Sequence, residues 1–162
     1  MPVTTKQLRV GIYARVSTTD QKCSQQLTEL KKYCRFRNWK VEGEYVDHGV
    51  SGTKASRPAM NRLMDKAKIG HVDAIAVWKL DRWGRSVTHF TASVRELDNL
   101  GVRFIAVTQG IDTDKSTPGG RLMMNILASF AEFERDIIVE RTLDGLARAR
   151  REGKTLGRPG KS

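Results

Sequence analysis

Apolar and polar residues alternate with a period of two at the start of the chain. This pattern predicts a β-strand over 10–17, with four aliphatic side chains on one face and Tyr13, Arg15 and Ser17 on the other. The polar members of the second face gather at the C-terminal end of the strand. In an open parallel sheet that end borders the ligand crevice, so the strand is a candidate for positioning chemical groups there.

Helical and strand-like patterns then follow one another. Apolar residues recur every three or four positions in three segments, and short apolar or alternating runs occupy three others. We expect helices over 20–37, 58–70 and 87–101, and strands over 39–46, 72–78 and 102–107. The third helix is marked by apolar residues at Val87, Phe90, Val94 and Leu97. The polar segments 47–57 and 109–117 are predicted to be loops. Alternating strands and helices indicate the α/β class, with a Rossmann-like, mostly parallel central sheet flanked by helices.

The pattern changes after residue 117. From Pro118 to Glu152 there is no strong helix breaker, and apolar positions continue over five turns. A helix of this length would be about 50 Å long. One small domain cannot cover it, so we expect its surplus apolar surface, including Phe130 and Phe133, to meet a second subunit.

The charge balance indicates a polyanionic partner. The 162 residues include 29 Lys and Arg against 18 Asp and Glu, a net charge of +11, which suggests nucleic acid, with an anionic membrane surface as the alternative. The end of the chain, 141–162, is especially basic, and its last part is broken by Gly and Pro. This part is interpreted as an arm that follows a phosphate backbone or enters a minor groove, or else as a solubilising tail. The chain has no apolar run of about 18 residues and no signal-like start, so we expect a cytoplasmic protein.

The cysteines and histidines do not suggest redox or metal chemistry. Cys23 and Cys34 would share a helix face but lie about 16 Å apart along its axis, too far for a disulfide. We interpret them as buried core thiols. His48, His71 and His89 fall in separate segments without a carboxylate or cysteine at ligand spacing, so no metal site is predicted.

Charged residues follow two of the predicted strands. Arg15 and Ser17 end the first strand, and Arg82 and Arg85 follow the strand over 72–78. The carboxyl ends of parallel strands meet at one edge of a sheet, where guanidinium groups would suit a phosphate cradle. The arginines could instead form a surface ion-pair cluster. Ser17, taken alone, is better explained as a helix N-cap.

Four segments, in order, resemble the motifs of a known family, the catalytic domain of the resolvase/invertase serine recombinases. Segment 13–17 resembles the nucleophile motif, 50–57 the second active-site loop, and 80–85 the arginine motif. The fourth, Phe133-Glu134-Arg135 followed by Glu140-Arg141-Thr142, resembles the signature of the long interface helix. The resemblance covers nearly the whole chain.

The resemblance implies site-specific recombination, in which duplex DNA is cleaved and rejoined through a covalent phosphoserine–DNA intermediate. Ser17 would be the nucleophile, and four arginines would surround the scissile phosphate: Arg15, Arg57, Arg82 and Arg85. Asp81 would orient these arginines or assist proton transfer. Gln21 and Gln26 would position Ser17 and the backbone. The complete set of expected DNA-binding positions is Tyr13, Gln21, Gln26, Ser51, Glu134, Arg135, Arg141, Arg148, Arg151 and Arg158.

The resemblance also implies a domain layout and partners. We expect an α/β catalytic core at 1–117, a long dimerisation and DNA-contacting helix at 118–152 within the same domain, and a basic arm or linker at 153–162. Family members generally carry a further DNA-reading domain, which is expected to be absent from this chain. They act as dimers at each crossover site and as a tetramer during strand exchange, with no metal, no nucleotide cofactor and no membrane. The protein would associate with the nucleoid when it binds DNA.

Two other functions compete with this one. The chain could be a non-catalytic dimerisation and DNA-binding module in which Ser17 only caps a helix. A phosphate-ester hydrolase is disfavoured because the chain lacks a set of metal-binding carboxylates and a Gly-rich phosphate loop. The presence of Ser17 together with all four arginines favours the recombinase, because a module without catalysis has no physical need for the complete set.

Overall fold

A five-stranded sheet forms the centre of the computed structural model, which describes residues 6–17, 22–49, 57–84 and 86–158. The strand order is β2-β1-β3-β4-β5. The strands are β1 (Arg9–Ser17), β2 (Lys40–Gly49), β3 (Ala74–Val77), β4 (Arg103–Ala106) and β5 (Ile111–Asp112). The first four are parallel, and β5 pairs antiparallel with β4. The predicted α/β class with a mostly parallel sheet is confirmed.

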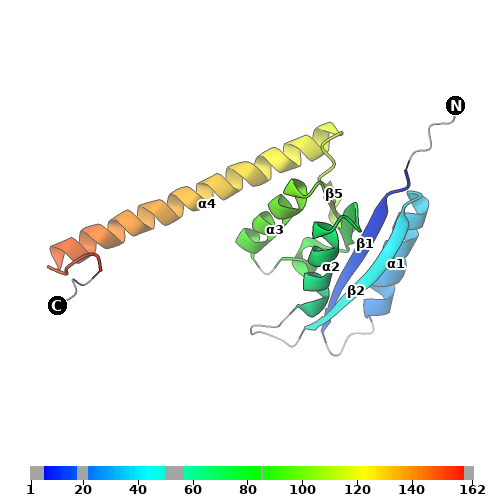
Figure 1. Ribbon diagram of the computed structural model, residues 1–162, viewed down its shortest axis with the longest axis horizontal. Coiled ribbons are helices and arrows are strands. Elements are labelled where there is room, and N and C mark those ends of the chain that lie inside the picture. Colours follow the sequence, from blue (N-terminus) through cyan, green and yellow to red (C-terminus); the bar gives the residue numbers. More distant parts are fainter. Residues whose placement is uncertain (1–5, 18–21, 50–56, 85, 159–162) are drawn as a thin grey trace.

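Within the described residues, four α-helices and two short 3-10 turns complete the fold. The helices are α1 (Lys22–Phe36), α2 (Pro58–Lys68), α3 (Val87–Asn99) and α4 (Pro118–Arg151), and the turns are η1 (Leu80–Arg82) and η2 (Val107–Gln109). Helix α1 covers one face of the sheet, and α2 and α3 cover the other (Figure 1). Pro58 stands at the start of α2, and Gly70 and Gly101 follow α2 and α3 with positive φ, as their positions in the sequence predicted.

Strand β1 is buried on both faces. Val10 and Ile12 pack with Leu30 and Cys34 of α1, whereas Tyr13 belongs to the core on the opposite face. The predicted division of the strand between two faces is therefore confirmed. Cys34 is a buried free thiol, and burial raises its pKa to about 11. The side chain of Cys23 lies outside the described part of the chain.

Two predicted loops differ in the structure: one is shorter than predicted, and the other contains a strand. The loop predicted over 47–57 starts later, because Asp47 and Gly49 pair with Arg15 and Ser17 and thereby extend β2. The loop predicted over 109–117 contains β5. A strand of two residues has no periodicity that a sequence could show, because its partner defines it.

Helix α3 buries Val94 and Leu97, two of the four apolar positions that predicted it, and Phe90 packs half-buried against the same core. The fourth apolar position, Val87, is 57% exposed, whereas Thr91 and Ser93 are buried. The helix begins at Val87, with Ser86 as its N-cap, so its first turn lies at the rim of the domain. Ser93 is tolerated in the core because its hydroxyl has hydrogen-bond partners.

Helix α4 has 34 residues, as the unbroken helical pattern predicted. It contacts β5 and α3 and then extends beyond the rest of the domain (Figure 1). Its exposed large apolar residues are Leu122, Ile126, Phe133, Ile138, Val139, Leu143 and Leu146. Among the described residues, none of the helices combines the length and the apolar character that a membrane span requires.

Candidate active site

The carboxyl ends of the parallel strands meet η1 and the first turn of α2 at one edge of the sheet. Nη1 of Arg82, in η1, lies 3.3 Å from the backbone carbonyl oxygen of Arg15 and donates a hydrogen bond to it. Both arginine side chains are half-buried. The structure thus places η1 directly beside the end of β1, as the topology of a parallel sheet leads one to expect.

A cavity of about 260 Å³ opens beside this contact. It is lined by Gln25, Gln26, Trp78, Lys79, Asp81 and Arg82. Gln26 is only 6% exposed. Its Oε1 and the Nε of Arg82 are both buried, and neither atom has a hydrogen-bond partner among the described residues. Because a buried polar group without a partner is costly, these two atoms are suited to bind a group that enters the cavity.

Arg57 approaches the same edge from α2. It immediately precedes Pro58 and is 7% exposed. Its Nη1 donates a hydrogen bond to the backbone carbonyl oxygen of Trp83 and lies 3.6 Å from Sδ of Met60. Since Trp83 directly follows η1, this contact holds the start of α2 against the segment that carries Arg82.

Asp47 is a residue of this edge that the sequence reasoning missed. It is 4% exposed and accepts hydrogen bonds from the Tyr13 hydroxyl at 2.9 Å and from the backbone N–H groups of Ala59 and Met60 at 2.8 and 3.1 Å. A carboxylate at a helix N-terminus is stabilised by these amides and by the helix dipole. No local pattern identified Asp47, because it acts through a strand partner and a helix that are distant in sequence.

Tyr13 serves as the donor in this arrangement. Burial and the hydrogen bond to Asp47 both raise the pKa of Tyr13 well above its usual range, so the hydroxyl keeps its proton. The side chain is fully buried and packs edge-on against Trp83, with ring centroids 5.4 Å apart. The structure therefore places Tyr13, which was expected to contact DNA, within the protein interior behind the site.

The remaining expected site residues fall into four groups. Asp81 lines the cavity with an exposed side chain. Glu134, on α4, accepts a hydrogen bond of 2.7 Å from Thr88 of α3, and Arg135 is exposed. Four exposed arginines lie on the far half of α4 and beyond it, away from the sheet edge (Figure 1): Arg141, Arg148, Arg151 and Arg158. Gln21, Ser51, Arg85 and the side chain of Ser17 lie outside the described residues.

Comparison with known proteins identifies the family of the chain. Residues 10–155 match the family model described as "Resolvase, N terminal domain". The chain belongs to the resolvase family of serine recombinases. It is a catalytic domain of the resolvase/invertase type, whose activity is the site-specific cleavage and religation of DNA.

Relatives in this serine recombinase family span transposons and bacteriophages. The chain is 40% identical to the Staphylococcus aureus transposon Tn552 DNA-invertase BinR over 154 residues, which are 95% of the chain and 75% of the relative. It is also 40% identical to the serine recombinase gin of Escherichia phage Mu over 149 residues, 92% of the chain and 72% of the relative.

Solved structures of serine recombinases share the fold. The N-terminal catalytic domain of TP901-1 integrase is 38% identical with a TM-score of 0.69, and the match covers 80% of this chain and 98% of that structure. A resolvase family site-specific recombinase from Streptococcus pneumoniae is 30% identical with a TM-score of 0.70, covering 90% of this chain and 99% of the other.

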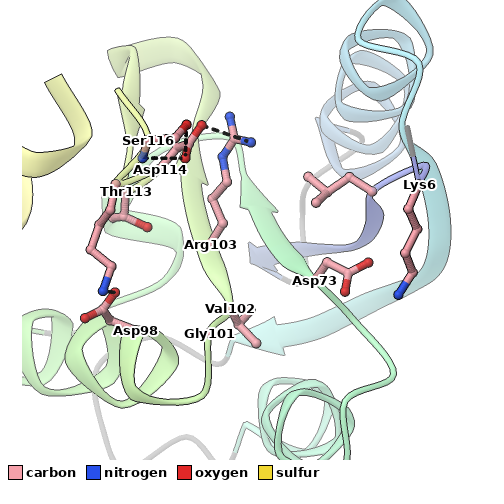
Figure 2. A pocket seen from close by; sticks show the side chains of 11 residues that line it. Lys6, Asp73, Asp98, Gly101, Val102, Arg103, Thr113, Asp114 and Ser116 are labelled. Atoms are coloured by element: carbon pink, nitrogen blue, oxygen red, sulfur yellow. Dashed lines mark hydrogen bonds and ion pairs between the residues drawn. The ribbon is translucent and has the colours of Figure 1, made fainter. Parts of the chain in front are cut away.

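The resolvase domain has a second, larger cavity at the opposite, amino end of its strands. This cavity has a volume of about 470 Å³, and Figure 2 shows the charged side chains that line it. Its carboxylates already have basic partners in the protein: Asp73 pairs with Arg9 at 3.0 Å, Asp98 with Lys115 at 3.0 Å, and Asp114 with Arg103 at 3.6 Å. None of the expected active-site residues lines it, so size alone does not identify the reactive site.

Proposed function

We propose that the Ser17 hydroxyl attacks a DNA phosphodiester at the carboxyl edge of the sheet. The serine oxygen forms a bond to phosphorus while a deoxyribose oxygen leaves. The proton lost by the serine is balanced by the one that the leaving oxygen gains, so this transesterification needs no other reactant. The bond energy is kept in the phosphoserine ester and is available for religation.

The observation that carries this proposal is the Nε of Arg82, which is buried at the wall of the 260 Å³ cavity and has no hydrogen-bond partner within the described part of the chain. A guanidinium N–H that is held in place and lacks a partner is a ready donor to a phosphate oxygen, and a planar guanidinium binds phosphate in a fixed geometry. Its neighbour Arg15 lies at the end of the strand that also carries Ser17. This arrangement supports a phosphate bound between η1 and the end of β1.

The other groups receive roles around that phosphate. Arg15, Arg57 and Arg85 would share with Arg82 the neutralisation of charge that develops on the nonbridging oxygens in the transition state. Asp81, on the exposed side of the cavity, would orient arginines or assist proton transfer. Gln26 would position the serine and the DNA backbone from the buried side, together with Gln21 and Ser51.

DNA binding and assembly would involve α4. We propose that residues 1–117 form the catalytic core, 118–152 the helix that contacts both DNA and a second copy of the chain, and 153–162 a basic arm. The net charge of +11 and the arginines at the far end of α4 support duplex DNA as the partner, since phosphate contacts account for most nonspecific affinity. The exposed apolar side chains of α4 support a homodimer, and a tetramer during synapsis. The protein would act in the cytoplasm, on the nucleoid.

A covalent trap tests the nucleophile. The chain is fused to a DNA-binding domain of known specificity and incubated with a duplex that carries two inverted sites, and the reaction is stopped with denaturant. The wild type should yield a protein–DNA adduct, and Ser17→Ala should abolish it. Ser24→Ala, which alters an exposed serine of α1, is the matched control and should keep the adduct.

Two outcomes would contradict the proposal. An adduct that persists in Ser17→Ala would exclude Ser17 as the nucleophile. A wild type that binds the duplex as a dimer and never cleaves it would instead support the non-catalytic DNA-binding module.

A further inference from the structure

We propose that Trp83 is a positioning residue and that the hydrogen bond from its indole to Ser93 sets the position of the arginine-bearing segments at the sheet edge. This inference rests on the proposed function, because it concerns how the proposed phosphate-binding groups are held. Trp83 directly follows η1, which carries Arg82, and its side chain is completely buried although the surrounding motif is polar.

The indole is held by contacts on several sides. Nε1 donates a hydrogen bond of 2.8 Å to Oγ of Ser93 in α3. The ring packs edge-on against Tyr13 at a centroid distance of 5.4 Å and lies 5.6 Å from the ring of Phe104. The aromatic contacts limit where the ring can lie, and the directional hydrogen bond fixes its rotation within that space.

Ser93 occupies an unusual position for a polar residue. It is buried in the core face of α3, where its hydroxyl accepts from the indole and donates to the backbone carbonyl oxygen of Phe90 at 2.9 Å. The hydroxyl is thus satisfied in both capacities, and its direction is defined by the second bond. Helix α3 thereby presents an acceptor at one fixed point beneath η1.

The backbone of Trp83 contacts Arg57, the second arginine at this edge of the sheet. Its carbonyl oxygen accepts the hydrogen bond from Nη1 of Arg57, at the start of α2. The same start of α2 is held by Asp47, which the Tyr13 hydroxyl contacts. Trp83 is therefore linked to both arginines: its backbone carbonyl binds Arg57, and Arg82 is the residue that precedes it in the chain.

The next residue in the chain keeps this segment close to α3. A Cβ added to Gly84 would lie 2.8 Å from Cβ of Phe90, closer than real side chains approach. The backbone after Trp83 thus passes directly against the turn of α3 that holds Ser93. Because the indole is fixed to α3 on one side and to Tyr13 on the other, a shift of the indole would move Arg82 and Arg57 together.

The test compares removal of this hydrogen bond with an equal loss of stability elsewhere. Ser93→Ala leaves the indole N–H without an acceptor, Trp83→Phe removes the donor, and the double variant removes both groups. Leu30→Val, in the core on the α1 face, is the matched control for destabilisation. The readouts are the single-turnover rate constant of adduct formation at saturating DNA, the dissociation constant for DNA, and the thermal midpoint.

Ser93→Ala should lower the rate constant by about ten-fold or more, because small misplacements of catalytic groups are costly. The dissociation constant for DNA should change by less than about two-fold, because the substitution removes no contact that the ground-state complex with DNA uses. Leu30→Val should lower the thermal midpoint without slowing adduct formation. The double variant should be no slower than the slower single variant, because both substitutions disrupt one interaction. Equal slowing in Leu30→Val, or multiplicative losses in the double variant, would overturn the inference.

A second readout does not depend on catalysis. Hydrogen exchange at the buried Nε–H of Arg82, followed by NMR in the wild-type chain, should accelerate by about ten-fold in Ser93→Ala and remain unchanged in Leu30→Val. Exchange that is equal in the wild type and Ser93→Ala would refute the positioning role. If the wild type forms no adduct, the proposed function fails, and this exchange comparison still decides whether Trp83 positions Arg82.

Discussion

The hydroxyl of Tyr13 lies 2.9 Å from Oδ2 of Asp47, and both side chains are buried between β1, β2 and the start of α2. The carboxylate also accepts hydrogen bonds from two backbone N–H groups of α2, those of Ala59 and Met60. It therefore joins the strand that carries Ser17 to the helix that follows Arg57. This link is structural, and its loss should be visible in stability as well as in catalysis.

We predict that Asp47→Asn lowers the free energy of unfolding by about 2 kcal/mol, because an amide cannot accept on both sides and its NH₂ group would face a helix N–H. Tyr13→Phe removes only one hydrogen bond and should cost about 1 kcal/mol. Urea unfolding monitored by circular dichroism measures both. Glu42→Gln, an exposed change on the same strand, is the control and should cost less than about 0.5 kcal/mol. A loss in Asp47→Asn no larger than in this control would contradict the assigned role.

Asp73 gives a pH-dependent prediction. Two side-chain hydrogen bonds from Arg9, at 3.0 and 3.1 Å, lower the pKa of Asp73. A lowered carboxyl pKa contributes stability that is complete above the unfolded-state value of about 4 and is lost as the pH falls through the folded-state value. Asp73→Asn should therefore cost up to about 1 kcal/mol at neutral pH, because the pair is partly exposed.

This difference between Asp73→Asn and the wild type should shrink steadily below about pH 4, as urea unfolding over a pH series will show. Glu96→Gln, which removes an exposed ion pair with Lys68, provides the baseline. A difference that persists undiminished in acid would show that Asp73 acts by packing and not through its charge.

Two adjacent glycines at the start of α4 should respond in opposite ways to the same substitution. A Cβ on Gly120 would collide with the backbone carbonyl of Asp114, whereas a Cβ on Gly119 would meet no atom within 4 Å. Gly120→Ala should therefore destabilise the domain by about 1–3 kcal/mol. Gly119→Ala should stabilise it by about 0.5–1 kcal/mol, since alanine favours the helix. Thermal and urea unfolding of the two variants test this pair, and equal effects would contradict the close approach of α4 to residue 114.

Phe133 and Phe36 form a matched pair for the proposed subunit contact. Phe133 is 60% exposed and lines an open groove of about 480 Å³ on α4 with Ile126 and Phe130, whereas Phe36 is 88% exposed at the end of α1. Phe133→Lys should weaken self-association by about ten-fold or more. Phe36→Lys should leave it unchanged. Sedimentation over a range of concentrations, with and without DNA, measures the effect, and equal weakening by both substitutions would contradict an interface on α4.

Much of the fold follows from local periodicity. The strands over 10–17 and 72–78 and the long helix from Pro118 could be predicted because each has enough residues to show its period. The meeting of Arg15 and Arg82 followed from a general property of parallel sheets, in which carboxyl ends share an edge.

The remaining features depend on partners that are distant in sequence. The extension of β2 through Asp47 requires its register with β1, and β5 exists only as a partner of β4. The burial of Trp83 within a polar motif and its bond to Ser93 depend on how η1 packs over α3. The chemical groups of the candidate site could therefore be predicted from the sequence more readily than the residues that contact them.

Helix α4 is packed against the domain near its start and exposed near its end. Its first turns are seated against β5 and the residues before it, whereas in 138–151 every side chain except that of Ala149 is exposed. Over a length of about 50 Å, a tilt of about 10° at Pro118 displaces Arg151 by about 9 Å. That displacement exceeds the spacing of two base pairs, about 7 Å. If α4 contacts DNA as proposed, a small adjustment near Gly120 would therefore shift the basic end of the helix along the duplex by more than one base pair.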